Sequence, residues 1–290
     1  TAGAAGIEQA YRLAEQGKIA GGVNRVLLAT DGDFNVGISR PDQLKRFIES
    51  KRKTGVFLSV LGFGTGNLND ALMQSLAQNG NGSAYYIDSL REAQKVLVEQ
   101  AGSTLFTIAG DVKIQVEFNP QVVSEYRLIG YETRALKRQD FNNDRVDAGD
   151  VGAGHSVTAL YEITPVGAAA TLLDPLRYGE TVKLEGGKVN SSEIGYFKLR
   201  YKPADGDVSR LIETPITQEM VRDKLAAASN DTRFAIAVAA FGQKLAGSAY
   251  VGDMDWAQIR QLAAGARGKD EQGYRAEFLS LIDIAASLSQ

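Results

Sequence analysis

The hydrophobic period of this chain changes near residue 105, and that change restricts the folds it can adopt. Up to that point, short continuous apolar runs alternate with segments in which apolar residues recur every three or four positions. Such alternation predicts strands joined by helices, which form a parallel α/β sheet with right-handed crossovers. Beyond it, apolar and polar residues alternate singly, as in antiparallel strands. From about residue 217 the helical period returns.

The predicted parallel sheet is a partial doubly wound sheet. Its three strands are expected at "RVLLAT" (25–30), "VFLSVLGF" (56–63) and "SAYYID" (83–88). The first has the composition of a central strand, yet only two parallel strands follow it. We therefore expect an apolar sheet edge that pairs with a retained fragment, another copy of the chain or some other segment.

Turn and cap residues delimit the helices of this part. Gly17 is predicted to close a helix that begins near Gly3. Pro41 suits the first turn of a second helix, which ends before Gly55. The remaining predicted caps are Asn67 for the third helix and a capping box of Ser89 and Glu92 for the helix from 90 to about 102.

The antiparallel region is predicted from segments such as "DVKIQVEF" (111–118). Its alternation places Val112 and Ile114 on the buried face and Lys113 on the exposed face. The same period recurs in residues 156–164, 196–201 and 208–214. We predict three parts: a partial parallel-sheet domain at 1–105, an antiparallel β-sandwich-like domain at 106–215 and a helical region at 216–290.

The composition excludes several classes of site. The chain has no cysteine, which rules out thiol catalysis, disulfides and zinc–thiolate sites. Its net charge is −3 and no Lys/Arg cluster is interleaved with aromatics. The sequence therefore lacks the concentrated positive charge that binds a nucleic acid. The apolar run "FAIAVAAF" (234–241) is far shorter than the ~20 residues that span a bilayer, so membrane insertion of this chain is not expected.

The motifs do not favour an enzyme. His155 is the only histidine, and Ser156 is too close to it in sequence to be its natural partner in a catalytic triad. "GFGTGN" (62–67) has Asn67 where a dinucleotide fingerprint requires its third glycine. "DFNNDRVDAGD" (140–150) begins like a calcium loop but lacks that loop's glycine and final glutamate. A hairpin loop is favoured there, with a calcium site as the alternative.

The strand at 25–30 ends by presenting a carboxylate. In "RVLLATDGDFNVG" (25–37), Asp31 follows the strand directly and Gly32 lets the chain turn away. Ligands of open parallel sheets bind beyond the carboxyl ends of the strands, which is where Asp31 is expected. Asp before Gly also stabilises turns, so a purely structural role is the alternative.

Together with "GVFLSVLGFG" and "GSAYYIDS", this stretch resembles the second half of a von Willebrand factor type A domain. The resemblance implies a metal-ion-dependent adhesion site in which Asp31 is the family's aspartate and Thr1, by its spacing from Ile7, is the family's threonine. Asp33 and Asn35 are then expected on the rim, where they contact the partner. The family's Asp-x-Ser-x-Ser loop and first three strands are not in this chain, so the site is incomplete here.

The function implied by the resemblance is non-enzymatic binding of a protein ligand that presents a carboxylate. A Mg²⁺ or Mn²⁺ ion is expected in the full-length protein, with weak or absent binding in this chain, because one hydroxyl and one carboxylate are too few ligands for Mg²⁺. The alternative is a scaffolding module of a cell-envelope assembly with a vestigial metal site.

The rest of the chain, above all "DFNNDRVDAGDVGAGHSVTALYEITP", resembles bacterial proteins in which a type A domain precedes a β-rich extension and terminal helices. Such proteins are often exported, sometimes as lipoproteins. Because the chain opens at Thr1 rather than Met, we expect a native segment upstream of it that carries any targeting signal.

Overall fold

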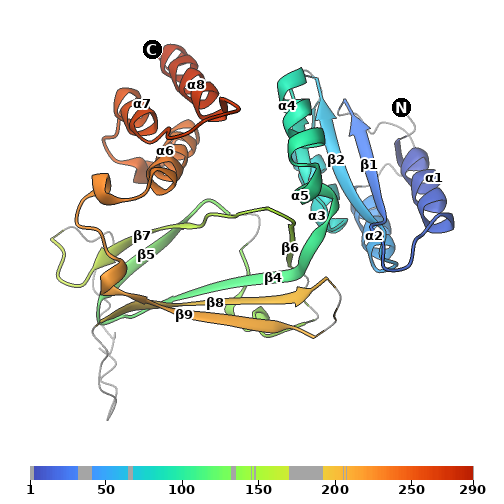
Figure 1. The fold of residues 1–290 in the computed structure, drawn as a ribbon, viewed down its shortest axis with the longest axis horizontal. Coiled ribbons are helices and arrows are strands. Elements are labelled where there is room, and N and C mark those ends of the chain that lie inside the picture. The colour runs from blue at the N-terminus through green and yellow to red at the C-terminus, as the bar shows by residue number, and fades with distance from the viewer. Residues whose placement is uncertain are drawn as a thin grey trace, which may run out of the picture. The chain divides into compact units, whose positions relative to one another are not determined.

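The computed structural model in Figure 1 contains a parallel sheet, two antiparallel sheets and a group of C-terminal helices. By their contacts, the residues form two compact units, of which one comprises 1–115, 136–156 and 198–212 and the other 116–135, 157–197 and 213–290. The structure describes residues 3–31, 41–64, 68–131, 135–144, 146, 148–169, 192–204, 206 and 208–289.

The parallel sheet belongs to the first unit and has the order β1-β2-β3. Its register pairs Thr30 with Gly62 and Phe63 with Ile87, so the three strands end at one edge. The strands are β1 (Arg25–Thr30), β2 (Phe57–Phe63) and β3 (Ala84–Ile87). Its helices are α1 (Gly3–Gln16), α2 (Pro41–Arg52), α3 (Asp70–Asn79), α4 (Leu90–Gln94) and α5 (Ala101–Leu105), with a π-helical turn, η1 (Lys95–Glu99), between the last two.

The two faces of this sheet are covered by different helices. Leu58 and Val60 lie in a core with buried residues of α1, α2 and α3. On the other face, Leu61 lies in a smaller core with Ile87 and with Val96 of the π-helical turn. Each fully buried aliphatic side chain of this kind stabilises the fold by ~1.5–3 kcal/mol. Successive side chains of β2 point to opposite faces of the sheet, so this one strand packs against helices on both sides.

The predicted helix caps are found in part. Ser89 accepts a hydrogen bond from the Glu92 backbone N–H at 3.2 Å, as expected at the start of α4, but the Glu92 carboxylate accepts from Lys95 Nζ at 3.0 Å. The cap of α3 is Asn69, whose side chain accepts from Leu72 N–H at 3.0 Å. Asn67, the predicted cap, lies outside the described residues. The prediction of Asn67 as the cap is therefore wrong by two residues, since asparagines lie on both sides of Leu68.

The antiparallel strands form sheets of four and two strands. The larger has the order β6-β4-β8-β9 and the smaller pairs β5 with β7. Their bounds are β4 (Thr107–Phe118), β5 (Val123–Ile129), β6 (Gly149–Gly152), β7 (Leu160–Pro165), β8 (Glu193–Pro203) and β9 (Arg210–Thr217), with a 3₁₀ turn, η2, at Arg138–Asp140.

The faces predicted for β4 are wrong at Lys113 and Ile114. Lys113 is 1% exposed, whereas Ile114 is 41% exposed. The register of β4 against β6 shifts between Ala109 and Val112, and Asp111 between them has a left-handed backbone with φ of 51°. A bulge of one residue exchanges the two faces of a strand, which simple alternation does not anticipate.

The C-terminal helices belong to the second unit and enclose a core of their own. Ala237, Ile259, Ala263 and Ile282 are fully buried in it. Asp255 and Gln258 form a capping box at the start of α7. The helices are α6 (Asn230–Leu245), α7 (Trp256–Gly265) and α8 (Tyr274–Leu288), with 3₁₀ turns η3 (Gln218–Met220), η4 (Leu225–Ala227) and η5 (Ala249–Val251).

These elements confirm the predicted fold class: a partial parallel α/β sheet, antiparallel sheets and C-terminal helices. Among the described helices, none combines the length and apolar character that crossing a membrane requires. The three-part division at residues 105 and 215 stays a prediction.

Candidate functional site

The carboxyl-end edge of the parallel sheet is the candidate site. Asp31 follows β1 directly and is exposed. The first turn of α1 lies near the same end of β1, as Figure 1 shows. Asp31 and the first turn of α1 therefore lie at the same edge of the sheet.

The neighbouring strands contribute other groups to this edge. The Gly64 carbonyl accepts a hydrogen bond from the Tyr86 hydroxyl at 2.9 Å, and the φ of Gly64 is 88°. Asp88 follows β3 and is exposed. Because β2 separates their strands, the backbones of Asp31 and Asp88 lie about 10 Å apart along this edge, twice the usual strand spacing.

Of the predicted site residues, only Asp31 is described. Thr1, Asp33 and Asn35 lie outside the described residues, so their roles stay predictions. Within the described part of the chain, no group of three or more His, Cys, Asp or Glu side chains is arranged to hold a metal ion. What the structure offers at this edge is two exposed carboxylates, Asp31 and Asp88, with the Tyr86 hydroxyl and the Gly64 carbonyl on neighbouring strands.

The other sequence signals lie elsewhere. His155 is exposed in the turn after β6, where its backbone N–H donates to the Gly152 carbonyl at 3.1 Å. His155 is therefore a turn residue in the structure. Residues 65–67 of "GFGTGN" lie outside the described residues.

A buried ionic cluster on β4 and β8 was not predicted from the sequence. The Nζ of Lys113 lies 3.0 Å from Oδ1 of Asp111 and donates to the Asn143 carbonyl at 2.8 Å. Lys202 on β8 approaches Oδ2 of the same Asp111 at 3.1 Å. The backbone N–H of Asp111 donates to Asp150 at 3.3 Å. The buried carboxylate of Asp111 therefore joins two lysines. Lys113 and the Asp111 backbone in turn connect Asn143 and Asp150 to β4.

The stretch "DFNNDRVDAGD", for which a calcium loop was the alternative, is attached to this sheet through Asp144. Asp144 accepts hydrogen bonds from Ser209 Oγ at 2.9 Å and from Arg200 Nη2 at 2.9 and 3.0 Å. The Ser209 hydroxyl first, and then Arg200, hold the pKa of Asp144 below its usual value. These protein groups already supply partners to Asp144. The predicted hairpin is wrong, because β5 and β6, the strands before and after this stretch, belong to different sheets. Lys198, Arg200 and Lys202, alternating on β8, were the signal that could have indicated acidic partners.

The opposite edge of the parallel sheet carries a partly buried cation. Arg25 at the start of β1 donates to Ser59 Oγ at 2.8 Å and lies 5.5 Å from the Phe57 ring centroid. Burial lowers the pKa of its guanidinium. Burial also raises the pKa of Tyr11, against the opposing effect of Arg25. Tyr11 is fully buried and Arg25 partly so, whereas Asp31 is exposed, which makes the Asp31 carboxylate the better candidate for a ligand.

Comparison with known proteins assigns the C-terminal two thirds of the chain to a family. The family described as "Uncharacterized protein YfbK, C-terminal" matches residues 103–288. Over 285 residues, 98% of this chain, the sequence is 49% identical to "Uncharacterized protein YfbK" of Escherichia coli (strain K12) and covers 48% of that protein. The chain thus spans about half the length of the curated relative it matches.

Two solved structures are also similar. A von Willebrand factor type A protein from Catenulispora acidiphila is 17% identical, with 90% of this chain and 59% of that chain covered at a TM-score of 0.43. Human COPII-coat protein Sec24c is 14% identical, with 92% and 36% covered at a TM-score of 0.40. Scores this low support no functional assignment. The family match and the 49% identity are sufficient by themselves: the chain belongs to the YfbK C-terminal family.

Proposed function

We propose that this chain is part of a non-enzymatic protein-binding module that acts through the carboxyl-end edge of its parallel sheet. Asp31 supplies a carboxylate ligand, direct or through water, to a Mg²⁺ or Mn²⁺ ion, and Thr1 supplies a hydroxyl. An open position on the ion then accepts a carboxylate of a protein ligand, while Asp33 and Asn35 on the rim shape the choice of partner. The exposed position of Asp31 directly after β1 is the observation that supports this proposal most.

The proposed site is incomplete in this chain. A hard cation such as Mg²⁺ takes six oxygen ligands and retains water where protein ligands are few. One carboxylate and one hydroxyl leave its charge poorly neutralised. We therefore expect weak or absent metal binding by residues 1–290 alone and measurable binding only when upstream sequence supplies further oxygen ligands.

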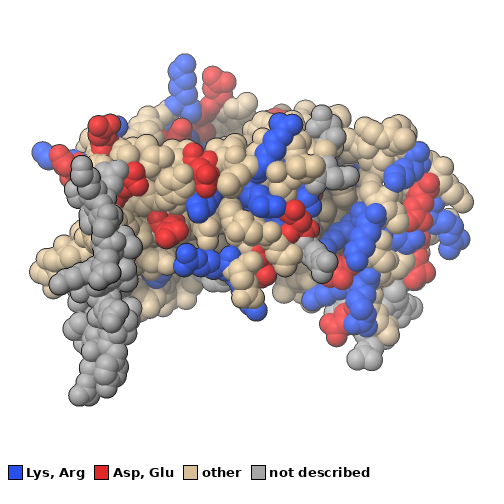
Figure 2. Space-filling view, turned by 90° about the horizontal axis from the view of Figure 1, so that it is seen from below, with Lys and Arg blue, Asp and Glu red and all other residues tan. Residues whose placement is uncertain are grey.

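The surface charge fits a protein partner better than a nucleic acid. On the face shown in Figure 2, Lys and Arg side chains are interspersed with Asp and Glu. This mixture agrees with the net charge of −3. Phosphate backbones are bound by surfaces on which positive charge is concentrated, so the face in Figure 2 has no such preference.

The test is metal-dependent thermal stabilisation of a chain extended upstream of Thr1. Metal at a hundred times its Kd adds ~2.7 kcal/mol to the free energy of unfolding if it binds only the folded state. We expect this shift in the extended chain, its loss in Asp31→Ala and its retention in Asp88→Ala, a matched change at the same edge. No shift in the extended chain, or an equal shift in both variants, contradicts the proposal.

A scaffolding role with a vestigial metal site is the second candidate. It is favoured by the apolar side chains exposed on β9, where Leu211 and Ile212 are each about half exposed. In that case partner assembly would be unchanged by Asp31→Ala and by chelation of divalent cations. Pull-down of partners with and without EDTA, for wild type and Asp31→Ala, separates the two candidates.

A further inference from the structure

The C-terminal helices carry two surface features of matching length. One is an apolar stripe on α8, made by Leu281, Ile284 and Leu288, which are 49%, 55% and 82% exposed. Their spacing of three and four residues places them on one side of the helix. Ile282, fully buried in the helical core, marks the opposite side of α8. The stripe therefore faces away from the helices that α8 packs against.

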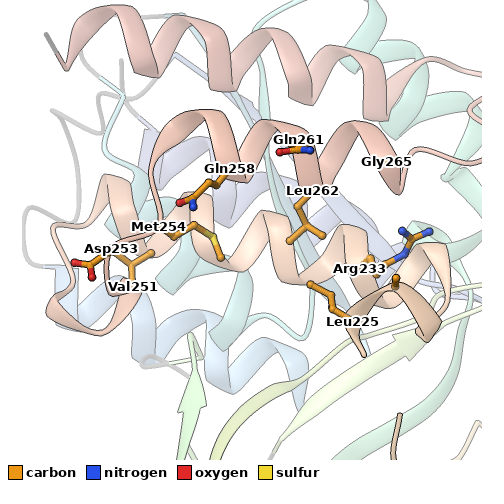
Figure 3. Close-up of a pocket in the computed structure, with 10 residues that line it drawn as sticks. Leu225, Arg233, Val251, Asp253, Met254, Gln258, Gln261, Leu262 and Gly265 are labelled. Atoms are coloured by element: carbon orange, nitrogen blue, oxygen red, sulfur yellow. The ribbon is translucent and has the colours of Figure 1, made fainter. Parts of the chain in front are cut away.

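The second feature is a groove of about 720 Å³ that runs along α7 (Figure 3). Gln258, Gln261, Leu262 and Gly265 line it at positions i, i+3, i+4 and i+7, which form one face of α7. The residues at the two ends of this face are seven apart, or about 10 Å along the helix. The end residues of the stripe on α8, Leu281 and Leu288, are also seven positions apart, so a helix presenting it has the length of the groove.

The groove has an apolar lining and a cation at one end. Val251, Met254 and Leu225 line it together with Leu262, while Arg233 and Asp253 lie toward opposite ends in Figure 3. Methionine adapts its shape to an inserted side chain, which suits it to such a surface. The lining is therefore suited to apolar side chains of the size of leucine.

Arg233 gives the groove a preferred direction. Its Nη2 donates to Asn230 Oδ1 at 2.6 Å, whereas its buried Nε has no hydrogen-bond partner among the described residues. On α8, Glu277 lies one turn before Leu281 and is exposed. A helix entering with Glu277 beside Arg233 would bring a carboxylate to the guanidinium and lay its apolar stripe over Leu262 and Met254.

We propose that the groove receives α8 of a second copy of this chain. The exchange is reciprocal, so that each copy gives its stripe and accepts that of its partner, and the interface is a two-fold dimer. Two stripes and two grooves are buried, which removes from solvent the most exposed side chain of the stripe, Leu288. The proposal is independent of the metal site at Asp31.

The first test is the mass of the full chain in solution by sedimentation or light scattering. We expect a species of twice the 31.1 kDa chain mass. Ile284→Glu places a charge in the stripe and is expected to raise the dimer Kd by about tenfold or more. Ser287→Glu is the matched control, because it adds the same charge to an exposed position in the same turn but off the stripe. It is expected to leave the Kd unchanged.

The pairing of Arg233 with Glu277 provides a second test. Arg233→Glu is expected to weaken the dimer, and adding Glu277→Arg to it is expected to restore association. Circular dichroism and the melting temperature show whether each variant is folded. A wild-type chain that stays monomeric up to about 1 mM, where even weak complexes form, overturns the proposal. So does a dimer that Ile284→Glu leaves intact, because another surface then holds it together.

Discussion

The parallel sheet and the larger antiparallel sheet each carry an aspartate, and the two differ in their exposure to solvent. Asp31 follows β1 and is exposed to solvent, whereas Asp111 within β4 is 7% exposed and binds two lysines. A buried carboxylate must be neutralised by partners, because an isolated charge is costly in a protein interior. An exposed one has no such requirement. Asp111 therefore stabilises the fold, whereas the exposed Asp31 is accessible to a ligand.

The largest effect that tests this comparison is expected at Lys113. Lys113→Met removes a partner of the buried Asp111, and breaking a buried ion pair costs ~3–5 kcal/mol. Urea unfolding measures this loss. Asp31→Ala, measured beside it without metal, should stay within ~0.5 kcal/mol of wild type, as surface changes do. Equal losses in the two variants would remove the distinction between the two aspartates.

Replacing both members of the buried pair sharpens the result. Asp111→Asn combined with Lys113→Met leaves no uncompensated carboxylate at this position. The double variant is therefore expected to be more stable than Lys113→Met alone, because neighbouring partners do not add independently. A double variant that loses the sum of the two single losses would show that the two side chains do not stabilise each other.

A smaller effect is expected at the open edge of the parallel sheet. β1 is the terminal strand of its sheet among the described residues, and Leu27 on it is 46% exposed. Lys on an edge strand opposes edge-to-edge pairing. Leu27→Lys should reduce the concentration-dependent light scattering of this chain while leaving its unfolding midpoint nearly unchanged. Scattering that does not fall would show that the aggregating surface lies elsewhere.

The smallest effect concerns acid pH. Because Ser209 and Arg200 lower the pKa of Asp144 in the folded state, its contribution to stability is present above the unfolded pKa of ~3.9. That contribution is lost as the pH falls through the lower folded value. Asp144→Asn should flatten the decline in melting temperature below about pH 4. An identical decline in the variant would show that Asp144 contributes nothing to it.

Local patterns predicted most of the secondary structure. The apolar runs at 25–30 and 56–63 and the cap at Ser89 are local signals, and each has its expected counterpart in β1, β2 and α4. The position of Asp31 at the sheet edge followed from the end of one strand. These features depend on neighbours in sequence, which is why a single sequence sufficed.

Features that join distant segments were not predictable in this way. The ionic cluster brings Lys113 together with residues 143 and 202, and so buries a side chain that simple alternation places outside. The groove on α7 needs side chains from η4, α6 and η5 as well. In both cases the determining contacts are tertiary, so the sequence supplied the residues without their arrangement.

The discontinuous first unit has a consequence during synthesis. It combines residues 1–115 with 136–156 and 198–212, and Gly152 of β6 fits so closely against α5 that an added Cβ would lie 1.7 Å from the Ser103 carbonyl oxygen. Ribosomes add roughly 5–20 residues per second. Several seconds therefore pass between the synthesis of the parallel sheet and that of residues 198–212, the last segment of the first unit. During this interval the nascent chain exposes surfaces that the finished unit covers, and chaperones can be expected to bind it then.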